Sequence, residues 1–143
     1  MTSLPTATLP TPAGQPLRIG LWVAQVLLCV VFVGAGLTKG FTPIPELSRM
    51  MPWTGQLPEG FVRFIACVDL AGGIGILLPS LTRIRPRLTV LAALGCAVLQ
   101  VLATGFHLSR GEASVVPLNV VLLALSLFVL WGRNRRAPIS ARG

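Results

Sequence analysis

The chain has 143 residues, of which 53% are hydrophobic and only 11% carry a charged side chain. A soluble domain carries about 25% charged residues, so a soluble fold of this size is excluded. Intrinsic disorder is excluded for most of the chain as well, because disorder requires low hydrophobicity. An integral membrane protein in a lipid bilayer remains. We therefore interpret the net charge of +8 as a sign of membrane topology, and we expect no nucleic-acid partner.

Both ends of the chain differ from the apolar centre. Residues 1–16 contain four prolines, several threonines and no charged side chain, which predicts a disordered tail. A cleaved signal peptide is the alternative, but the basic segment that should precede its apolar core is weak. Residues 133–143 are rich in arginine and predict a basic cytoplasmic tail, which orients the protein and contacts anionic lipid.

Charged residues divide the centre of the chain, residues 17–132, into four apolar stretches. A helix of about 20 residues, rising about 1.5 Å per residue, crosses a hydrocarbon core of about 30 Å. Each stretch has about this length, so the sequence predicts four transmembrane helices. The expected spans are 19–38, 61–81, 87–108 and 114–132.

The distribution of cations predicts the orientation in the membrane. With both termini on one side, that side holds eight cations, and the other side holds four that are diluted by three glutamates. We therefore predict a multi-pass protein of the bacterial cytoplasmic (inner) membrane with both termini cytoplasmic. The eight cations are Arg18, Arg83, Arg85, Arg87, Arg133, Arg135, Arg136 and Arg142, and the four are Lys39, Arg49, Arg63 and Arg110.

The connection from Gly40 to Leu57 is longer than a turn between two helices requires. Pro45 predicts the start of a short helix, and Trp53 predicts a place in the aromatic belt at the membrane surface. We expect this segment to lie on the outer surface and to anchor the bundle. A lid over an outward-facing pocket is the alternative.

Each expected helix has one stripe of polar and small residues, because these residues recur at steps of three and four. Such stripes should face each other, since the surface that faces lipid is apolar. The sequence therefore predicts an all-α fold, an integral membrane antiparallel four-helix transmembrane bundle with a polar interior. Five polar side chains are expected to converge in its outer half: Lys39, Asp69, Gln100, His107 and Asn119.

Asp69 is the most informative of these five residues. A carboxylate at that depth costs about 2.5–3.5 kcal/mol, so it has to be paired, protonated or in contact with water. One interpretation is an ion pair with Lys39 or His107 that fixes the helix register. The other is a functional site in which Asp69 and His107 handle protons. In that site Lys39, Gln100 and Asn119 would contact a ligand.

The sequence shows no motif for a metal or a bound cofactor. Cys29, Cys67 and Cys96 lie in apolar runs and form no C-x-x-C motif, so we interpret them as small hydrophobic residues. His107 is the single histidine, and without a second strong ligand we expect neither a metal nor a haem. Arg63 lies off the Asp69 stripe, and we expect it to reach the lipid headgroups.

Several segments, in their order and spacing, resemble the DoxX-like family of small bacterial membrane proteins. They are Gly34-Ala35-Gly36-Leu37-Thr38-Lys39, Met51-Pro52-Trp53, Leu57-Pro58-Glu59, Phe61-Val62-Arg63, Asp69-Leu70-Ala71-Gly72-Gly73-Ile74-Gly75-Ile76-Leu77-Leu78-Pro79, Phe106-His107-Leu108 and Asn119. The resemblance covers roughly residues 17–132 and implies a four-helix membrane fold. Similar proteins often have glutamate in place of Asp69, which keeps the charge on a longer side chain.

The resemblance also implies a function, because the family takes its name from a membrane subunit linked to thiosulfate and quinone oxidoreduction. We therefore expect a component of a quinone-linked membrane oxidoreductase that binds a quinone-like ligand and works with a redox partner protein. Two other functions stay open. One is a non-catalytic scaffold or assembly subunit, and the other is a small carrier of protons or solutes that acts as a homo-oligomer.

Overall fold

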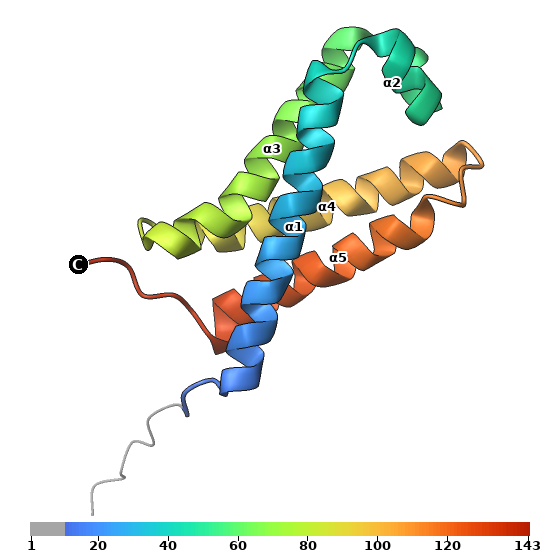
Figure 1. Ribbon diagram of the computed structural model, residues 1–143. Helices are drawn as coiled ribbons and strands as arrows, with labels where there is room; N and C mark the ends of the chain where they lie inside the picture. The colour runs from blue at the N-terminus through green and yellow to red at the C-terminus, as the bar shows by residue number, and fades with distance from the viewer. Residues whose placement is uncertain (1–10) are drawn as a thin grey trace, which may run out of the picture.

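The computed structural model describes residues 11–143 and contains only helices, turns and loops within that range (Figure 1). Four helices are long and apolar enough to cross a membrane: α1 (Gln15–Phe41), α3 (Glu59–Thr82), α4 (Arg87–Ser109) and α5 (Val116–Trp131). Three short elements complete the fold: helix α2 (Ile44–Met50), the 3₁₀ turn η1 (Pro52–Gly55) and the π-helical turn η2 (Gly132–Arg136). The predicted all-α fold with four membrane-spanning helices is confirmed.

The first helix begins earlier than the expected tail, residues 1–16, allows. α1 starts at Gln15, and Pro16 lies in its first turn. Proline fits there because the first N–H groups of a helix have no partner within the helix. Of the expected disordered tail, residues 1–10 lie outside the described residues.

The arginine-rich segment 133–143 folds back onto the bundle. The guanidinium of Arg83, in the α3–α4 turn, donates to the Ser140 carbonyl at 2.9 Å. In return, the backbone N–H of Arg142 donates to the Arg83 carbonyl at 2.8 Å. Arg133 is buried, so this segment is a packed part of the fold as well as a basic tail.

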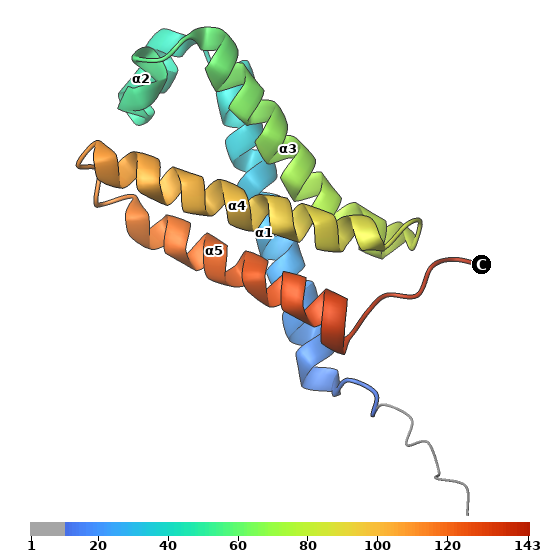
Figure 2. The ribbon, with the colours of Figure 1, turned by 180° about the vertical axis from the view of Figure 1, so that it is seen from behind.

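The long helices pack in an antiparallel order. α1 packs along α3, α3 along α4 and α4 along α5, and α1 also touches α5. Figures 1 and 2 show that the α1–α3 pair crosses the α4–α5 pair, and that the pairs diverge toward α2. We call the end formed by residues 42–58 and 110–115 the loop end. The termini end comprises the start of α1, the turn 83–86 and residues 132–143.

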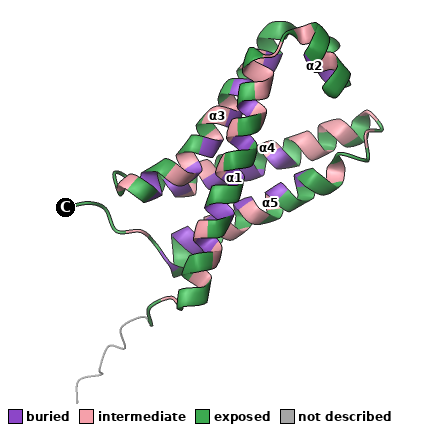
Figure 3. Ribbon diagram, viewed as in Figure 1, coloured by how far each residue is buried: buried purple, intermediate pink, exposed green. Residues whose placement is uncertain are grey.

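The outer faces of the four long helices are apolar. Val30, Leu91 and Leu102 are each between 62% and 65% exposed. Figure 3 shows exposed residues on the outer faces of the helices and buried residues where the helices meet. Such a surface suits hydrocarbon rather than water. The backbone N–H and C=O groups suit hydrocarbon as well, because they are hydrogen-bonded within the helices. The protein is therefore a multi-pass membrane protein surrounded by lipid.

An apolar core joins the four long helices. Aliphatic side chains supply most of it, and one phenylalanine and one cysteine fill the remaining space. Within a membrane, helices associate through van der Waals contacts between side chains, which replace their contacts with lipid, and these buried residues supply most of those contacts. The buried members of this core are Ala24, Leu28, Phe32, Ile76, Ala93, Cys96, Leu122 and Val129.

The segment between α1 and α3 packs onto the bundle. Leu47 of α2 and Trp53 of η1 are buried together with Val62 of α3. The Trp53 ring stands edge-on to Phe106 of α4, with 5.9 Å between the ring centres. The start of α2 at Ile44 confirms the predicted short helix. The Trp53 ring packs on apolar partners inside the fold and does not face lipid, so its place in an aromatic belt at the membrane surface stays a prediction.

Candidate functional site

Lys39 and Asp69 form an ion pair between the last turn of α1 and the middle of α3. Only 12% of the lysine side chain and 5% of the aspartate side chain are exposed. An isolated charge at this depth costs about 2.5–3.5 kcal/mol, so pairing is what lets both charges stay in the membrane. Of the two ion pairs that the sequence left open for Asp69, the pair with Lys39 is present.

Two glycines let α1 and α3 come close enough for this pair. Gly36 lies one turn before Lys39, and a Cβ added there would lie 2.9 Å from the Ala66 carbonyl oxygen of α3. A Cβ added at Gly73, one turn after Asp69, would lie 3.0 Å from the backbone nitrogen of Val33. A Cβ at either position would require the neighbouring backbone to shift, so glycine allows the two backbones to approach this closely.

Gln100 of α4 lies at the level of Asp69. The register between α3 and α4 follows from the contact of Gly72 with Cys96, because a Cβ added at Gly72 would lie 2.9 Å from Cys96 Sγ. One turn further toward the loop end, the antiparallel helices bring Asp69 opposite Gln100. Gln100 is 6% exposed, and its side-chain oxygen has no hydrogen-bond partner among residues 11–143.

His107 belongs to a second polar cluster, at the turn between α4 and α5. Its Nδ1 lies 2.6 Å from Glu112 Oε2, and Arg110 Nε donates to Glu112 Oε1 at 3.0 Å. Arg110 also donates to Gln56 at 2.6 Å, which ties this turn to the segment before α3. The hydrogen bond with His107, followed by the hydrogen bond and charge of Arg110, lowers the pKa of Glu112. The hydrogen-bond partner of His107 is thus Glu112.

The five predicted site residues therefore divide into groups. Lys39 and Asp69 are in contact, and Gln100 lies at their level. His107 is held in its own cluster nearer the loop end. Asn119, in the first turns of α5, is 7% exposed, and its amide nitrogen has no partner within the described part of the chain. The roles in proton handling and ligand binding stay predictions.

Arg63 has a structural role that the sequence did not indicate. Its Nη1 donates to the carbonyls of Lys39 at 2.7 Å and Thr42 at 2.9 Å, and its Nη2 lies 2.9 Å from Glu59. The last carbonyls of a helix have no partner within that helix, so Arg63 caps α1 from the neighbouring helix. The prediction that Arg63 reaches the headgroups is wrong. Its place near the start of α3, the long helix that packs along α1, was the one available signal.

A further polar network lies toward the termini end, and the residue pattern did not predict it. Gln25 Nε2 donates to the Ile76 carbonyl at 2.7 Å and to Ser80 Oγ at 2.9 Å. Ser80 shares a hydrogen bond of 2.8 Å with Thr89, and Arg133 Nε donates to Gln25 Oε1 at 2.7 Å. The network joins α1, α3, α4 and η2. Its sequence signal was the place of Gln25 on the polar stripe of the first helix.

The site around Lys39 and Asp69 combines groups that suit a small polar ligand. A lysine ammonium can donate to carbonyl oxygens, and a carboxylate is a group that can accept or release a proton. The amide of Gln100 both donates and accepts. Apolar helix faces surround these groups, and electrostatic interactions are strong in such surroundings.

These features define an integral membrane protein whose apolar four-helix bundle encloses polar and ionic side chains. The model of the DoxX-like family matches residues 23–129. The chain therefore belongs to the DoxX-like family, as the resemblance indicated. No curated protein and no solved structure matches the chain.

Proposed function

We propose that the protein is a membrane component of a quinone-linked oxidoreductase system, with its quinone site at Lys39, Asp69 and Gln100. The observation that supports this most strongly is the ion pair buried within the membrane-spanning helices. Gln100 lies at the same level, and its amide oxygen, which has no partner among the described residues, can accept a hydrogen bond from the hydroxyl of a quinol. Ionisable side chains inside a membrane mark sites of function more often than not.

The chemistry of a quinone matches these side chains. Its two carbonyl oxygens accept hydrogen bonds, and the Lys39 ammonium and the Gln100 amide are donors. Reduction to the quinol consumes two electrons and two protons. A redox partner protein supplies the electrons, and Asp69 exchanges protons with the ring oxygens. His107 exchanges protons nearer the loop end, and Asn119 contacts the ligand from α5.

Orientation and location belong to the same proposal. We propose that the termini end faces the cytoplasm and that the membrane is the inner membrane of a bacterium. The termini end has arginines in all three of its segments, whereas Glu46, Glu59 and Glu112 all belong to the loop end or its border. An excess of cations on one side of the membrane marks the cytoplasmic side.

Binding of coenzyme Q1, a short-chain ubiquinone, tests the proposal. We would titrate the full chain in lipid nanodiscs and compare it with the double variant Lys39→Met/Asp69→Leu. That variant removes both charges, so no unpaired charge is buried and the bundle is expected to fold. The expected result is one bound quinone for the wild type and at least about tenfold weaker binding for the variant, since a charge-assisted hydrogen bond is lost.

The control variant is Glu46→Gln/Arg49→Gln, which removes one acid and one base from exposed positions on α2. Its affinity for the quinone should equal that of the wild type. Equal binding by all three proteins would refute the proposed site.

A scaffold subunit is the second candidate, and a specific observation favours it. The ion pair is closed, and close glycine contacts flank it on both sides, as in a purely architectural joint. If the protein is a scaffold, the wild type should not bind the quinone, and the variant Lys39→Met/Asp69→Leu should be at least as stable as the wild type.

A further inference from the structure

The termini end holds a buried cation that neutral groups surround. Arg133, in the π turn η2, is 6% exposed. Its Nε donates to Gln25 at 2.7 Å and its Nη1 to the Ala137 carbonyl at 3.1 Å. The guanidinium carbon lies 4.9 Å from the centre of the Trp22 ring. The remaining nitrogen, Nη2, has no hydrogen-bond partner within residues 11–143.

The π turn is what directs Arg133 into the bundle. Gly132, at its start, packs so closely on α1 that an added Cβ would overlap Leu21. The turn closes with a hydrogen bond of 2.7 Å from the N–H of Ala137 to the Gly132 carbonyl. The extra residue in this turn changes the direction of the side chains, and π turns of this kind often occur at functional sites. Arg135, two residues on, is exposed.

No acidic side chain of the chain is available to balance this charge. The four acidic residues are Glu46, Glu59, Asp69 and Glu112, and none of them lies at the termini end. The charged side chains near Arg133 are cations: Arg18 repels it, and Arg87 lines the same pocket. A buried charge without a counter-charge is costly, so the site calls for an anion.

A pocket with the right chemistry lies beside Arg133. It has a volume of about 220 Å³, and its polar lining residues include Arg87, Arg133, Ser80 and Asn134. The Arg87 guanidinium, the Arg133 Nη2 that has no partner among the described residues, and the Asn134 amide form a donor set that fits a phosphate group. The pocket is therefore an anion site by its composition.

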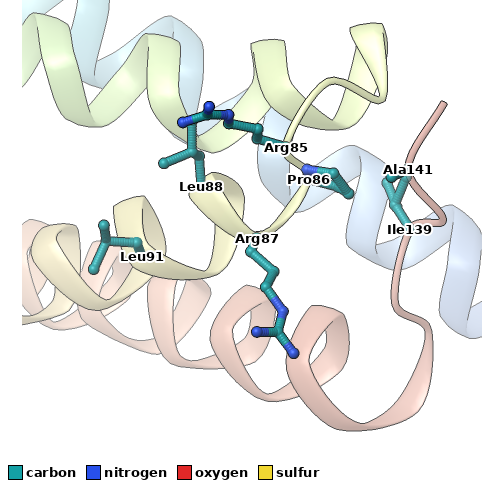
Figure 4. Close-up of a pocket in the computed structure, with 7 residues that line it drawn as sticks. All are labelled: Arg85, Pro86, Arg87, Leu88, Leu91, Ile139 and Ala141. Carbon is teal, nitrogen blue, oxygen red and sulfur yellow. The ribbon is translucent and has the colours of Figure 1, made fainter. Parts of the chain in front are cut away.

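A larger apolar pocket of about 650 Å³ continues from the first, and both share Arg87 and Ile139. Leu88 and Leu91 of α4 line it on one side, and the C-terminal segment lines it on the other (Figure 4). In Figure 4 the side chain of Arg87 extends from the start of α4 away from Arg85. An apolar space next to an anion site, at one end of the membrane-spanning helices, matches a phospholipid.

We propose that the termini end binds the phosphate of an anionic phospholipid. Arg87 and Arg133 hold the phosphate in the smaller pocket, and the apolar pocket accepts the beginning of an acyl chain along Leu88 and Leu91. Basic pockets between transmembrane helices bind such headgroups, and arginine binds phosphate oxygens in a bidentate manner.

Native mass spectrometry of the full chain in detergent, with added dioleoylphosphatidylglycerol or dioleoylphosphatidylcholine, tests this proposal. One phosphatidylglycerol should bind at least about tenfold more tightly than phosphatidylcholine. Arg87→Gln should weaken that binding at least about tenfold, because it removes a charged hydrogen bond. Arg87 is exposed, so this variant is expected to fold.

Arg135→Gln is the matched control, because Arg135 is exposed at the same end and lines neither pocket. Unchanged binding by Arg135→Gln supports a built site, whereas equal losses in both variants would show a diffuse basic surface and overturn the proposal. Glycerol 3-phosphate provides a second arm. If glycerol 3-phosphate at the same concentration as phosphatidylglycerol does not displace the lipid, the result supports a lipid as the occupant. If it displaces the lipid equally well, the occupant is a free phosphate compound and the proposal is overturned.

Discussion

The contact between α1 and α3 at Gly36 allows a sharp test of how the ion pair is positioned. A Cβ added at Gly36 would lie 2.7 Å from Leu70 Cγ and 2.9 Å from the Ala66 carbonyl oxygen. The leucine side chain can rotate away, but the carbonyl belongs to the backbone of α3. Gly36→Ala therefore has to push the two helices apart, one turn from Lys39.

Gly34→Ala is the matched control for this variant. A Cβ at Gly34 would meet nothing within 4 Å. Both variants replace glycine by alanine in the same helix, so both gain about 0.5–1 kcal/mol from helix propensity. Overpacking costs about 1–3 kcal/mol at Gly36 alone. We therefore expect Gly36→Ala to be less stable than Gly34→Ala by about 1–3 kcal/mol, because the propensity gain cancels in the comparison.

The assay is reversible unfolding of the purified protein by sodium dodecyl sulfate in dodecyl maltoside micelles, followed by far-ultraviolet circular dichroism. The difference between the two variants is the quantity of interest. If Gly36→Ala proves as stable as Gly34→Ala, the close approach of α1 and α3 is refuted. The explanation of how Lys39 reaches Asp69 would fall with it.

Two further predictions concern the ends of helices. Arg63→Lys should destabilise the bundle by about 1–3 kcal/mol in thermal unfolding, because a lysine has one nitrogen and cannot hold the Lys39 and Thr42 carbonyls and Glu59 at once, as the separate nitrogens of the planar guanidinium do; a lysine variant with wild-type stability would contradict the cap. The lowered pKa of Glu112 means that its contribution to stability is complete above the ordinary glutamate pKa and is lost as the pH falls through the lowered folded value. The melting temperature should therefore fall more steeply in acid for the wild type than for Glu112→Gln, and parallel pH curves would disprove this linkage.

The transmembrane helices were predictable because one physical requirement dominates them. A helix of about 20 residues without uncompensated charge can cross the bilayer, whatever its tertiary contacts are. The Lys39–Asp69 pair was predictable for a related reason. Both residues lie on the small-residue stripe of their helix, and a carboxylate at that depth needs a partner.

The other contacts depend on tertiary structure that helix faces do not reveal. The carboxylate that pairs with His107 lies beyond the end of the helix, in a turn whose path brings it back. Trp53 suits both a membrane surface and a buried position, and the approach of Phe106 covers its ring. Arg133 follows the last apolar run, where an arginine usually ends in water. The π turn that brings it inside has no signal in the residue pattern.

The hydrogen bond between Gln25 and Arg133 joins residues that are 108 positions apart. A ribosome completes α1 and its hairpin with α3 long before it reaches Arg133. Until then the side-chain oxygen of Gln25 lacks this donor, and the termini end of the assembling helices stays incomplete. Closure of that end therefore has to wait until all four long helices have been synthesised. A chain that stalls or is cut immediately before η2 would contain all four long helices but would leave the side-chain oxygen of Gln25 without its Arg133 donor.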